Sequence, residues 1–209
     1  MGTYTEGNFL GENSTEQLVT ELIRQIRYSK GFSIQTLPIA TGRTTNLPGG
    51  DNNWVAYGTM LEVSEAIYLT NRTKFRFLVP MSMTGSESTV IPAIYRYSGV
   101  NEQTNLPECT LIAYGDSLNA EQGGWYEEAM NLTENNVLST ANIYYFVYIY
   151  DTRSSLSMLG SPGTHNEHTP YISFSTLLDT VTSAPETLEM TAEAVLHAYG
   201  CIYASGDTR

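Results

Sequence analysis

The sequence predicts a mainly β protein with one amphipathic helix near its N-terminus, and three observations support this fold class. Threonine is the most used residue and tyrosine the commonest aromatic, and both suit a pleated, half-buried surface. From Trp54 onward, short apolar or alternating segments follow one another with turn residues between them. A helical apolar stripe with capping signals precedes these segments. The 209 residues fit one domain, or one domain with an appendage.

The N-terminal helix is expected over residues 15–30. Ser14 and Gln17 match a capping box for its first turn, and Gly31 can take the left-handed conformation that ends a helix. Between these signals an apolar stripe recurs at three- and four-residue spacing: Leu18, Val19, Leu22, Ile23 and Ile26. The stripe suits docking or oligomerisation around an axis, and it also suits packing on the chain's own body, which is the commoner outcome for such a helix.

The organisation of the chain changes after this helix. Phe32, Ile34 and Thr36 alternate with other residues as in a strand, whereas residues 38–53 are rich in Thr, Asn and Gly and predict a loop or linker. We therefore expect residues 1–53 to form an N-terminal attachment or oligomerisation segment. Residues 54–209 are expected to form a β-sandwich domain.

The predicted strands of this domain have no helices between them, which favours a sandwich or a barrel. Residues 143–150 are apolar on both faces and predict a central strand that is covered on both sides. Residues 185–200 fit a capped helix or a strand, and the alternation around Leu188 and Met190 favours the strand. The strands are expected at 54–60, 62–69, 74–79, 90–97, 109–114, 125–132, 142–150, 171–178 and, as one or two strands, 187–204.

Charge is distributed unevenly along the chain, whose formal net charge is -12. Up to Val100 there are eight basic and eight acidic residues, whereas from Asn101 onward two basic residues face fourteen acidic ones. The acidic balance opposes a groove that follows a phosphate backbone, so nucleic acid is not expected as a partner. The asymmetry indicates either that one end meets a partner while the other stays in solvent, or chance clustering on a solvated surface.

Several further classes are not expected from the sequence. The longest apolar run, 143–150, is much shorter than the roughly 20 residues that span a bilayer, so membrane insertion is not predicted. Residues 1–17 contain three Glu and no Lys or Arg, which is the reverse of a signal peptide. Cys109 and Cys201 are far apart in the sequence and are expected to be buried, reduced thiols.

Catalytic and metal motifs are weak. The sequence contains no G-x-S-x-G, phosphate-binding loop or H-E-x-x-H motif, so neither an enzyme nor a cofactor is expected. Glu127 and Glu128 resemble the paired carboxylates of a glycosidase, but neighbouring residues of a strand point to opposite faces. His165 and His168 could share a metal ion, although two ligands make an incomplete site and the segment predicts a solvated loop. No metal is therefore expected.

Aromatic residues offer a different kind of site. Trp125, Tyr126 and Tyr114 are candidates for ligand binding, because a flat aromatic face can stack on a sugar ring while its polar edge reaches water. The alternatives are core packing, intersubunit packing and contact with another protein.

Four segments together resemble the jelly-roll domains of bacteriophage fibre, receptor-binding and capsid-decoration proteins. They are KFRFLVPMSMTGSESTVIPAIYRYSG, CTLIAYGDSLNAEQGGWYEEAMNLTENN, ANIYYFVYIYD and ETLEMTAEAVLHAYGCIYA. The resemblance implies a jelly-roll-like antiparallel β-sandwich, a homotrimer, and an N-terminal segment that docks on other virion proteins. It also implies a non-enzymatic virion protein made in the host cytoplasm, with a host-surface glycan or protein as a further partner. A carbohydrate-binding module that uses exposed Trp and Tyr is the alternative.

Overall fold

The computed structural model describes eleven segments of the chain, and every regular element in them is a β-strand. The mainly β prediction is therefore confirmed. The expected helix at 15–30, with Leu18, Val19, Leu22, Ile23 and Ile26, lies outside the described residues. The described segments are 32–35, 43–46, 54–79, 89–119, 124–133, 136–151, 157–160, 173–179, 181–193, 196–197 and 200–204.

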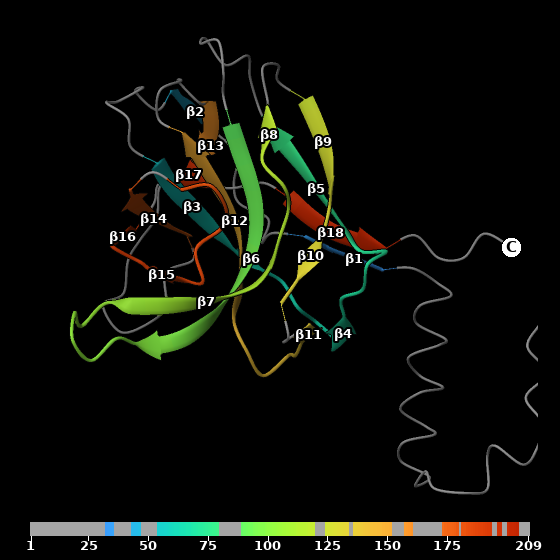
Figure 1. Ribbon diagram of the computed structural model, residues 1–209, viewed down its shortest axis with the longest axis horizontal. Coiled ribbons are helices and arrows are strands. Elements are labelled where there is room, and N and C mark those ends of the chain that lie inside the picture. The colour runs from blue at the N-terminus through green and yellow to red at the C-terminus, as the bar shows by residue number, and fades with distance from the viewer. Residues whose placement is uncertain are drawn as a thin grey trace, which may run out of the picture. The chain divides into compact units, whose positions relative to one another are not determined.

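Residues Ser33–Tyr203 form one compact unit. Its smaller main sheet has four strands (Figure 1). In spatial order they are β1 (Phe32–Gln35), β18 (Gly200–Ala204), β5 (Lys74–Val79) and β9 (Gly124–Ala129).

The larger sheet has nine strands, and all its pairs are antiparallel. Two short strands pair beside this path: β8 (Leu118–Asn119) with β6, and β15 (Thr187–Glu189) with β7. The main spatial order is β10 (Asn131–Leu132), β7 (Pro107–Tyr114), β6 (Thr89–Val100), β12 (Tyr144–Asp151), β3 (Trp54–Leu61), β14 (Ser173–Leu178) and β16 (Ala192–Glu193).

Two small sheets complete the described elements. One pairs β4 (Ile67–Tyr68) with β11 (Val137–Leu138), and the other joins β2 (Arg43–Asn46), β13 (Ser157–Gly160) and β17 (Leu196–His197). The expected loop at 38–53 therefore contains a strand. Thr44 and Thr45 suit a strand because they are β-branched, and pairing with β13, distant in sequence, selects that conformation.

Three strand predictions need correction. In 62–69 only Ile67–Tyr68 is a strand, and Glu62 and Glu65 are exposed in the irregular segment before it. The predicted strand 125–132 is two strands, β9 and β10, which belong to different sheets and are separated by the buried Met130. In 187–204, which was expected to be one or two strands, the described residues form four short ones, β15, β16, β17 and β18, so the strand interpretation of 185–200 is confirmed over the helix but the number of strands is not.

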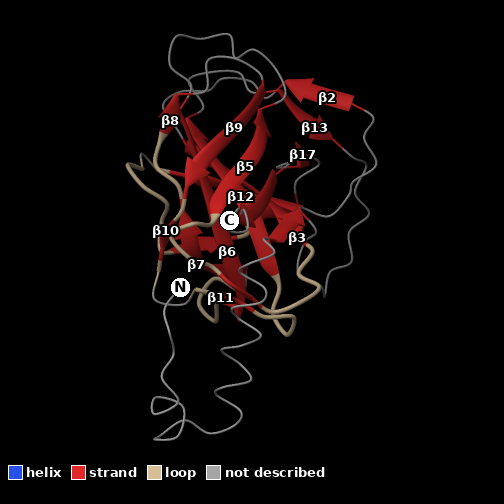
Figure 2. Cartoon of the chain, turned by 90° about the vertical axis from the view of Figure 1, so that its right-hand side faces the viewer, coloured by secondary structure: helices blue, strands red, loops and turns tan. Residues whose placement is uncertain are grey.

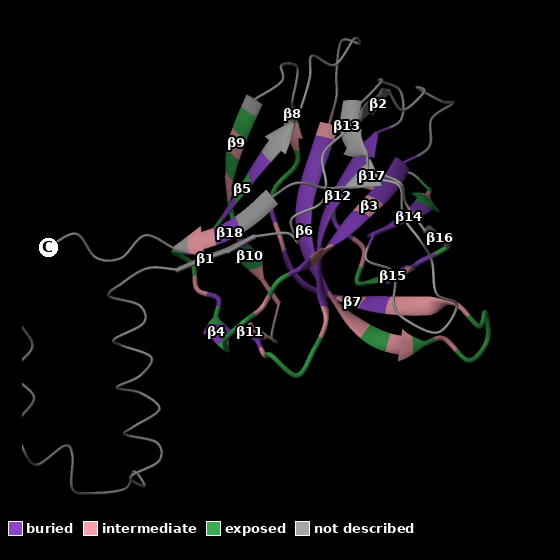
Figure 3. Cartoon of the chain, turned by 180° about the vertical axis from the view of Figure 1, so that it is seen from behind, coloured by how far each residue is buried: buried purple, intermediate pink, exposed green. Residues whose placement is uncertain are grey.

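Strand β12 lies at the centre of the larger sheet, and all of its residues are buried (Figure 3). It pairs along its length with β3 on one side and with β6 on the other. Side chains of a strand alternate between faces, so Tyr144, Phe146, Tyr148 and Tyr150 share one face, and Tyr145, Val147 and Ile149 share the other. The predicted central strand covered on both sides is confirmed.

The first face of β12 packs on the four-stranded sheet. Phe75 and Phe77 point inward from β5, and both are fully buried. The ring of Phe75 lies edge-on to Phe146 at 6.0 Å between centroids, and Phe77 lies 5.5 Å from Tyr148. Such tilted and edge-to-face pairs are the favoured arrangements of aromatic rings. The two sheets are therefore stacked through an aromatic layer.

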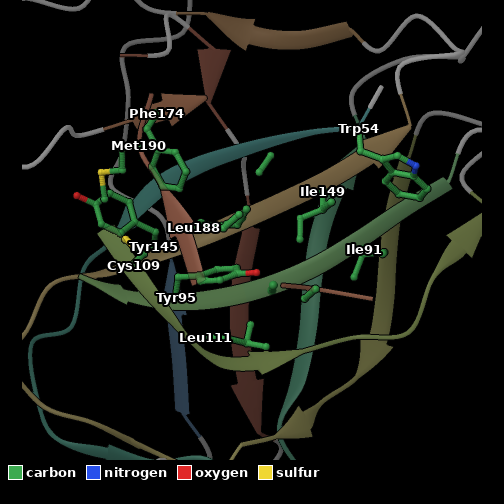
Figure 4. Packing of buried hydrophobic residues seen from close by; sticks show 14 residues of the cluster. Trp54, Ile91, Tyr95, Cys109, Leu111, Tyr145, Ile149, Phe174, Leu188 and Met190 are labelled. Carbon is green, nitrogen blue, oxygen red and sulfur yellow. The ribbon is translucent and has the colours of Figure 1, made fainter. Parts of the chain in front are cut away.

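The second face of β12 is covered by residues 181–193, here called the closing segment. Within it β15 pairs with β7, β16 pairs with β14, and only Met190 and Thr191 separate the two strands. Because β7 and β14 lie toward opposite edges of the larger sheet, the closing segment joins those edges and the sheet curls over this face. Figure 4 shows Leu188 and Met190 within the resulting apolar cluster.

Hydrogen bonds hold the closing segment on both sides. On the β7 side the amide of Leu111 donates to Glu186 O and that of Met190 to Pro107 O, each at 2.8 Å. On the β14 side Thr176 Oγ1 donates to Glu189 O, and the amide of Thr191 donates to Thr176 Oγ1 at 3.1 Å. A further hydrogen bond comes from β6, where the Tyr95 hydroxyl donates to Pro185 O at 2.8 Å.

One position beside the apolar cluster requires glycine. Gly58 of β3 is paired with Phe174 of β14, and a Cβ on Gly58 would lie 2.1 Å from Cε1 of the Phe174 ring. The ring is fully buried, so it has little room to move.

We expect Gly58→Ala to lower the free energy of unfolding by about 1–3 kcal/mol, the usual cost of overpacking a core. Phe174→Leu is destabilising by itself, but it removes the ring atoms that the new methyl group meets. In a double-mutant cycle measured by urea denaturation, Gly58→Ala should therefore cost less in the Phe174→Leu background. Equal costs in both backgrounds would contradict this explanation.

Candidate functional site

Trp125 lies on the outer face of the four-stranded sheet, and half of its side chain is exposed. Lys74 and Arg76 of β5 and Glu127 of β9 are also exposed. Successive side chains of a strand point to opposite faces, which explains this arrangement. Phe75, Phe77 and Tyr126 alternate with the exposed residues and point toward the other sheet. In Figure 2 the molecule is turned so that β5 and β9 lie in front of the other strands.

A contact joins two of the outer residues across the two strands. The guanidinium carbon of Arg76 lies 5.1 Å from the centroid of the Trp125 ring, within the range of a cation–π contact. Arg76 is directly opposite Glu127 in the ladder, and Lys74 is opposite Ala129 on one side and Tyr203 on the other. We call Lys74, Arg76, Trp125 and Glu127 the outer-face cluster.

The structure does not bring the three predicted aromatic residues together. Tyr126 turns inward and stacks on Phe77 with 5.9 Å between centroids. Tyr114 is partly buried and packs against the apolar cluster under the closing segment. Of the three, only Trp125 is on the outer face.

Sequence reasoning missed the cationic members of the outer-face cluster. Their signal was present, since Lys74 and Arg76 alternate with two phenylalanines in the predicted strand 74–79. The pairing of this strand with β9 was not readable from the sequence, and that pairing places Arg76 beside Trp125.

The two predicted acidic residues of β9 have different surroundings. Glu127 faces outward, whereas the Glu128 carboxylate accepts a hydrogen bond from the amide of Ala129 at 3.2 Å. Elsewhere, Asn101 Nδ2 donates to both Glu108 and Glu189 at 3.0 Å. This amide therefore links the hairpin between β6 and β7 to the closing segment.

A metal site is not assembled by the part of the chain that the structure describes. Within it no group of three or more His, Cys, Asp or Glu side chains is placed to hold an ion. His165 and His168 lie outside the described residues.

Cys109 is buried as predicted, and it lies in the apolar cluster beside Tyr95 and Tyr145. Burial raises the pKa of its thiol far above the ordinary value, and the charge of Glu108 adds to this rise. Burial likewise raises the pKa of Tyr95, Tyr145 and Tyr150. A reactive thiolate is therefore not available at Cys109 near neutral pH. The side chain of Cys201 lies outside the described residues.

Comparison of the chain with protein-family models, with characterised proteins and with solved structures gave no match. Among the described residues, there is no helix with the length and apolar character needed to cross a membrane.

The buried Cys109 thiol and the buried tyrosine hydroxyls predict a steep loss of stability at high pH. An unfolded thiol ionises at about 8.5 and an unfolded tyrosine at about 10, while the folded groups keep their protons to higher pH. Above those values the unfolded state binds fewer protons, so the free energy of unfolding falls by about 1.4 kcal/mol per pH unit for each group.

Urea denaturation at a series of pH values between 7 and 11 measures this dependence. Cys109→Ala serves as the matched variant, because it removes one titrating group and leaves the tyrosines. It should flatten the decline between pH 8.5 and 10 relative to the unmodified chain. The same decline in both proteins would show that Cys109 is not held as a neutral thiol.

Proposed function

We propose that this chain is a non-enzymatic structural protein of a bacteriophage virion, as a fibre, tail or capsid-decoration protein. It docks through the part of its N-terminal segment that precedes β1, residues 1–31, and displays its β-sandwich. The observation that carries the proposal is the pairing order of eight strands, which supports a jelly roll of the kind found in viral capsid and lectin domains.

A jelly roll can be described as one long antiparallel hairpin that is rolled into two layers. In chain order the eight strands are β1, β3, β5, β6, β7, β9, β12 and β18. The first pairs with the eighth, the second with the seventh, the third with the sixth and the fourth with the fifth. Alternate pairs belong to opposite sheets. In this interpretation β13–β17 are an insertion between the seventh and eighth strands.

Composition gives further support. The chain is acidic, contains Lys only at Lys30 and Lys74, and is rich in Thr, Ser, Asn and Tyr. Such a surface suits a protein made in the host cytoplasm and then displayed on a particle.

We propose a homotrimer, in which the stripe Leu18, Val19, Leu22, Ile23 and Ile26 supplies docking or oligomerisation contacts with sister copies or other virion proteins.

A carbohydrate-binding module is the second candidate. It is favoured by one observation, the half-exposed Trp125 beside Arg76 on a strand face. The flat face of an indole can stack on a sugar ring, and a guanidinium can donate hydrogen bonds to its polar groups. The two functions are compatible, because a displayed virion protein can also bind the host surface.

The virion assignment is tested by particle association. We expect the chain to sediment with purified particles at a copy number divisible by three, and to show a trimeric mass in light scattering. Deleting residues 1–31, which leaves β1 intact, should abolish incorporation. A monomeric mass, together with unchanged incorporation after this deletion, would contradict the proposal.

A further inference from the structure

We propose that the outer face of the four-stranded sheet binds an acidic saccharide, one that carries carboxylate or sulfate groups. Trp125 supplies the stacking platform on the part of its half-exposed ring that Arg76 does not cover, and Lys74 and Arg76 supply the donors to the anionic groups. The inference rests on the carbohydrate-binding form of the proposed function, and it names the residues and the class of ligand.

The composition of the outer-face cluster favours a polar ligand over a permanent protein interface. Stable interfaces have apolar centres from which Lys and Glu are depleted. Here the half-exposed indole of Trp125 has Arg76 against its ring, and Lys74 and Glu127 are exposed on the same face of the sheet. A sugar ring matches this set, because its C–H faces stack on an aromatic ring while its hydroxyl and acidic groups meet charged neighbours.

Local charge selects an anionic ligand. The chain as a whole has a net charge of -12, yet the outer-face cluster has two cations and one anion. Beyond Asn101 the chain contains only two basic residues, so this cationic face contrasts with the acidic half of the sequence. An acidic saccharide is attracted to this face by its excess of positive charge.

The geometry gives each side chain a separate task. Arg76 is held against the Trp125 ring, so its planar guanidinium is oriented before a ligand arrives and can bind a carboxylate or sulfate with two parallel hydrogen bonds. Lys74 lies two residues away on the same face, about 7 Å along the strand. The two cations can therefore meet acidic groups on one sugar or on adjacent sugars. The Glu127 carboxylate, opposite Arg76, can accept hydrogen bonds from sugar hydroxyls.

Retardation of the full chain in native gels containing a polysaccharide tests the proposal. The probes are polygalacturonate, with one carboxylate on each sugar, dextran sulfate, and neutral dextran. We expect retardation by both acidic polymers that weakens with added salt, and none by dextran. Trp125→Ala and Arg76→Gln should each reduce apparent affinity at least tenfold. Arg96→Gln removes a cation from β6, outside the cluster, and should leave it unchanged.

Chemical labelling of lysine gives a second readout that does not depend on a variant. The chain has only Lys30 and Lys74, so acylation by an activated ester followed by peptide mapping measures each amine separately. Polygalacturonate should slow acylation of Lys74 at least threefold relative to Lys30, and dextran should not.

Three results would overturn the inference. Retardation by dextran equal to that by the acidic polymers would show that the site does not select anions. Retardation that Trp125→Ala and Arg76→Gln leave intact would place binding on another surface, and no retardation by any polymer would remove the saccharide site. Particle association is measured independently, so the virion assignment can stand or fail separately from this site.

Discussion

The structure depends on the need to cover both faces of β12. A strand with aromatic or aliphatic side chains on each face is stable only where apolar surface meets it from both sides, and Tyr144–Asp151 is buried throughout. The four-stranded sheet covers one face through Phe75 and Phe77, and the closing segment covers the other. By bonding to β7 and β14, the closing segment also protects strands that would otherwise be open to association with other chains.

This division of the core leaves the outer face of the four-stranded sheet free for other uses. Its inward residues already satisfy the packing requirement, so Lys74, Arg76, Trp125 and Glu127 are not needed to bury apolar surface. The half-exposed indole, supported by a guanidinium, therefore lies on a layered β scaffold whose inner side chains are fixed. Rigid elements of this kind position binding side chains more accurately than loops do.

Local sequence patterns predicted much of this fold. The apolar run at 143–150 identified the central strand, and alternation at Leu188 and Met190 distinguished strand from helix. The patterns could not predict pairings between strands that are distant in sequence. Thr44 and Thr45 form a strand because they pair with β13, and residues 125–132 are two strands because β9 and β10, on either side of Met130, pair in different sheets. The site followed the same rule. Trp125 was found by residue type, Tyr126 and Tyr114 were misleading because orientation decides exposure, and Arg76 emerged only from the pairing of β5 with β9.

Amide hydrogen exchange measured by NMR tests the central claim, that the closing segment is an integral cover of β12. The amides of Leu111 and Met190 form the hydrogen bonds that join the closing segment to β7, and those of Tyr145–Tyr150 lie in the central strand. If the cover is integral, both sets exchange only through global unfolding and give the same free energy of opening. Fast exchange at Met190 and Leu111 with continued protection of β12 would contradict the account.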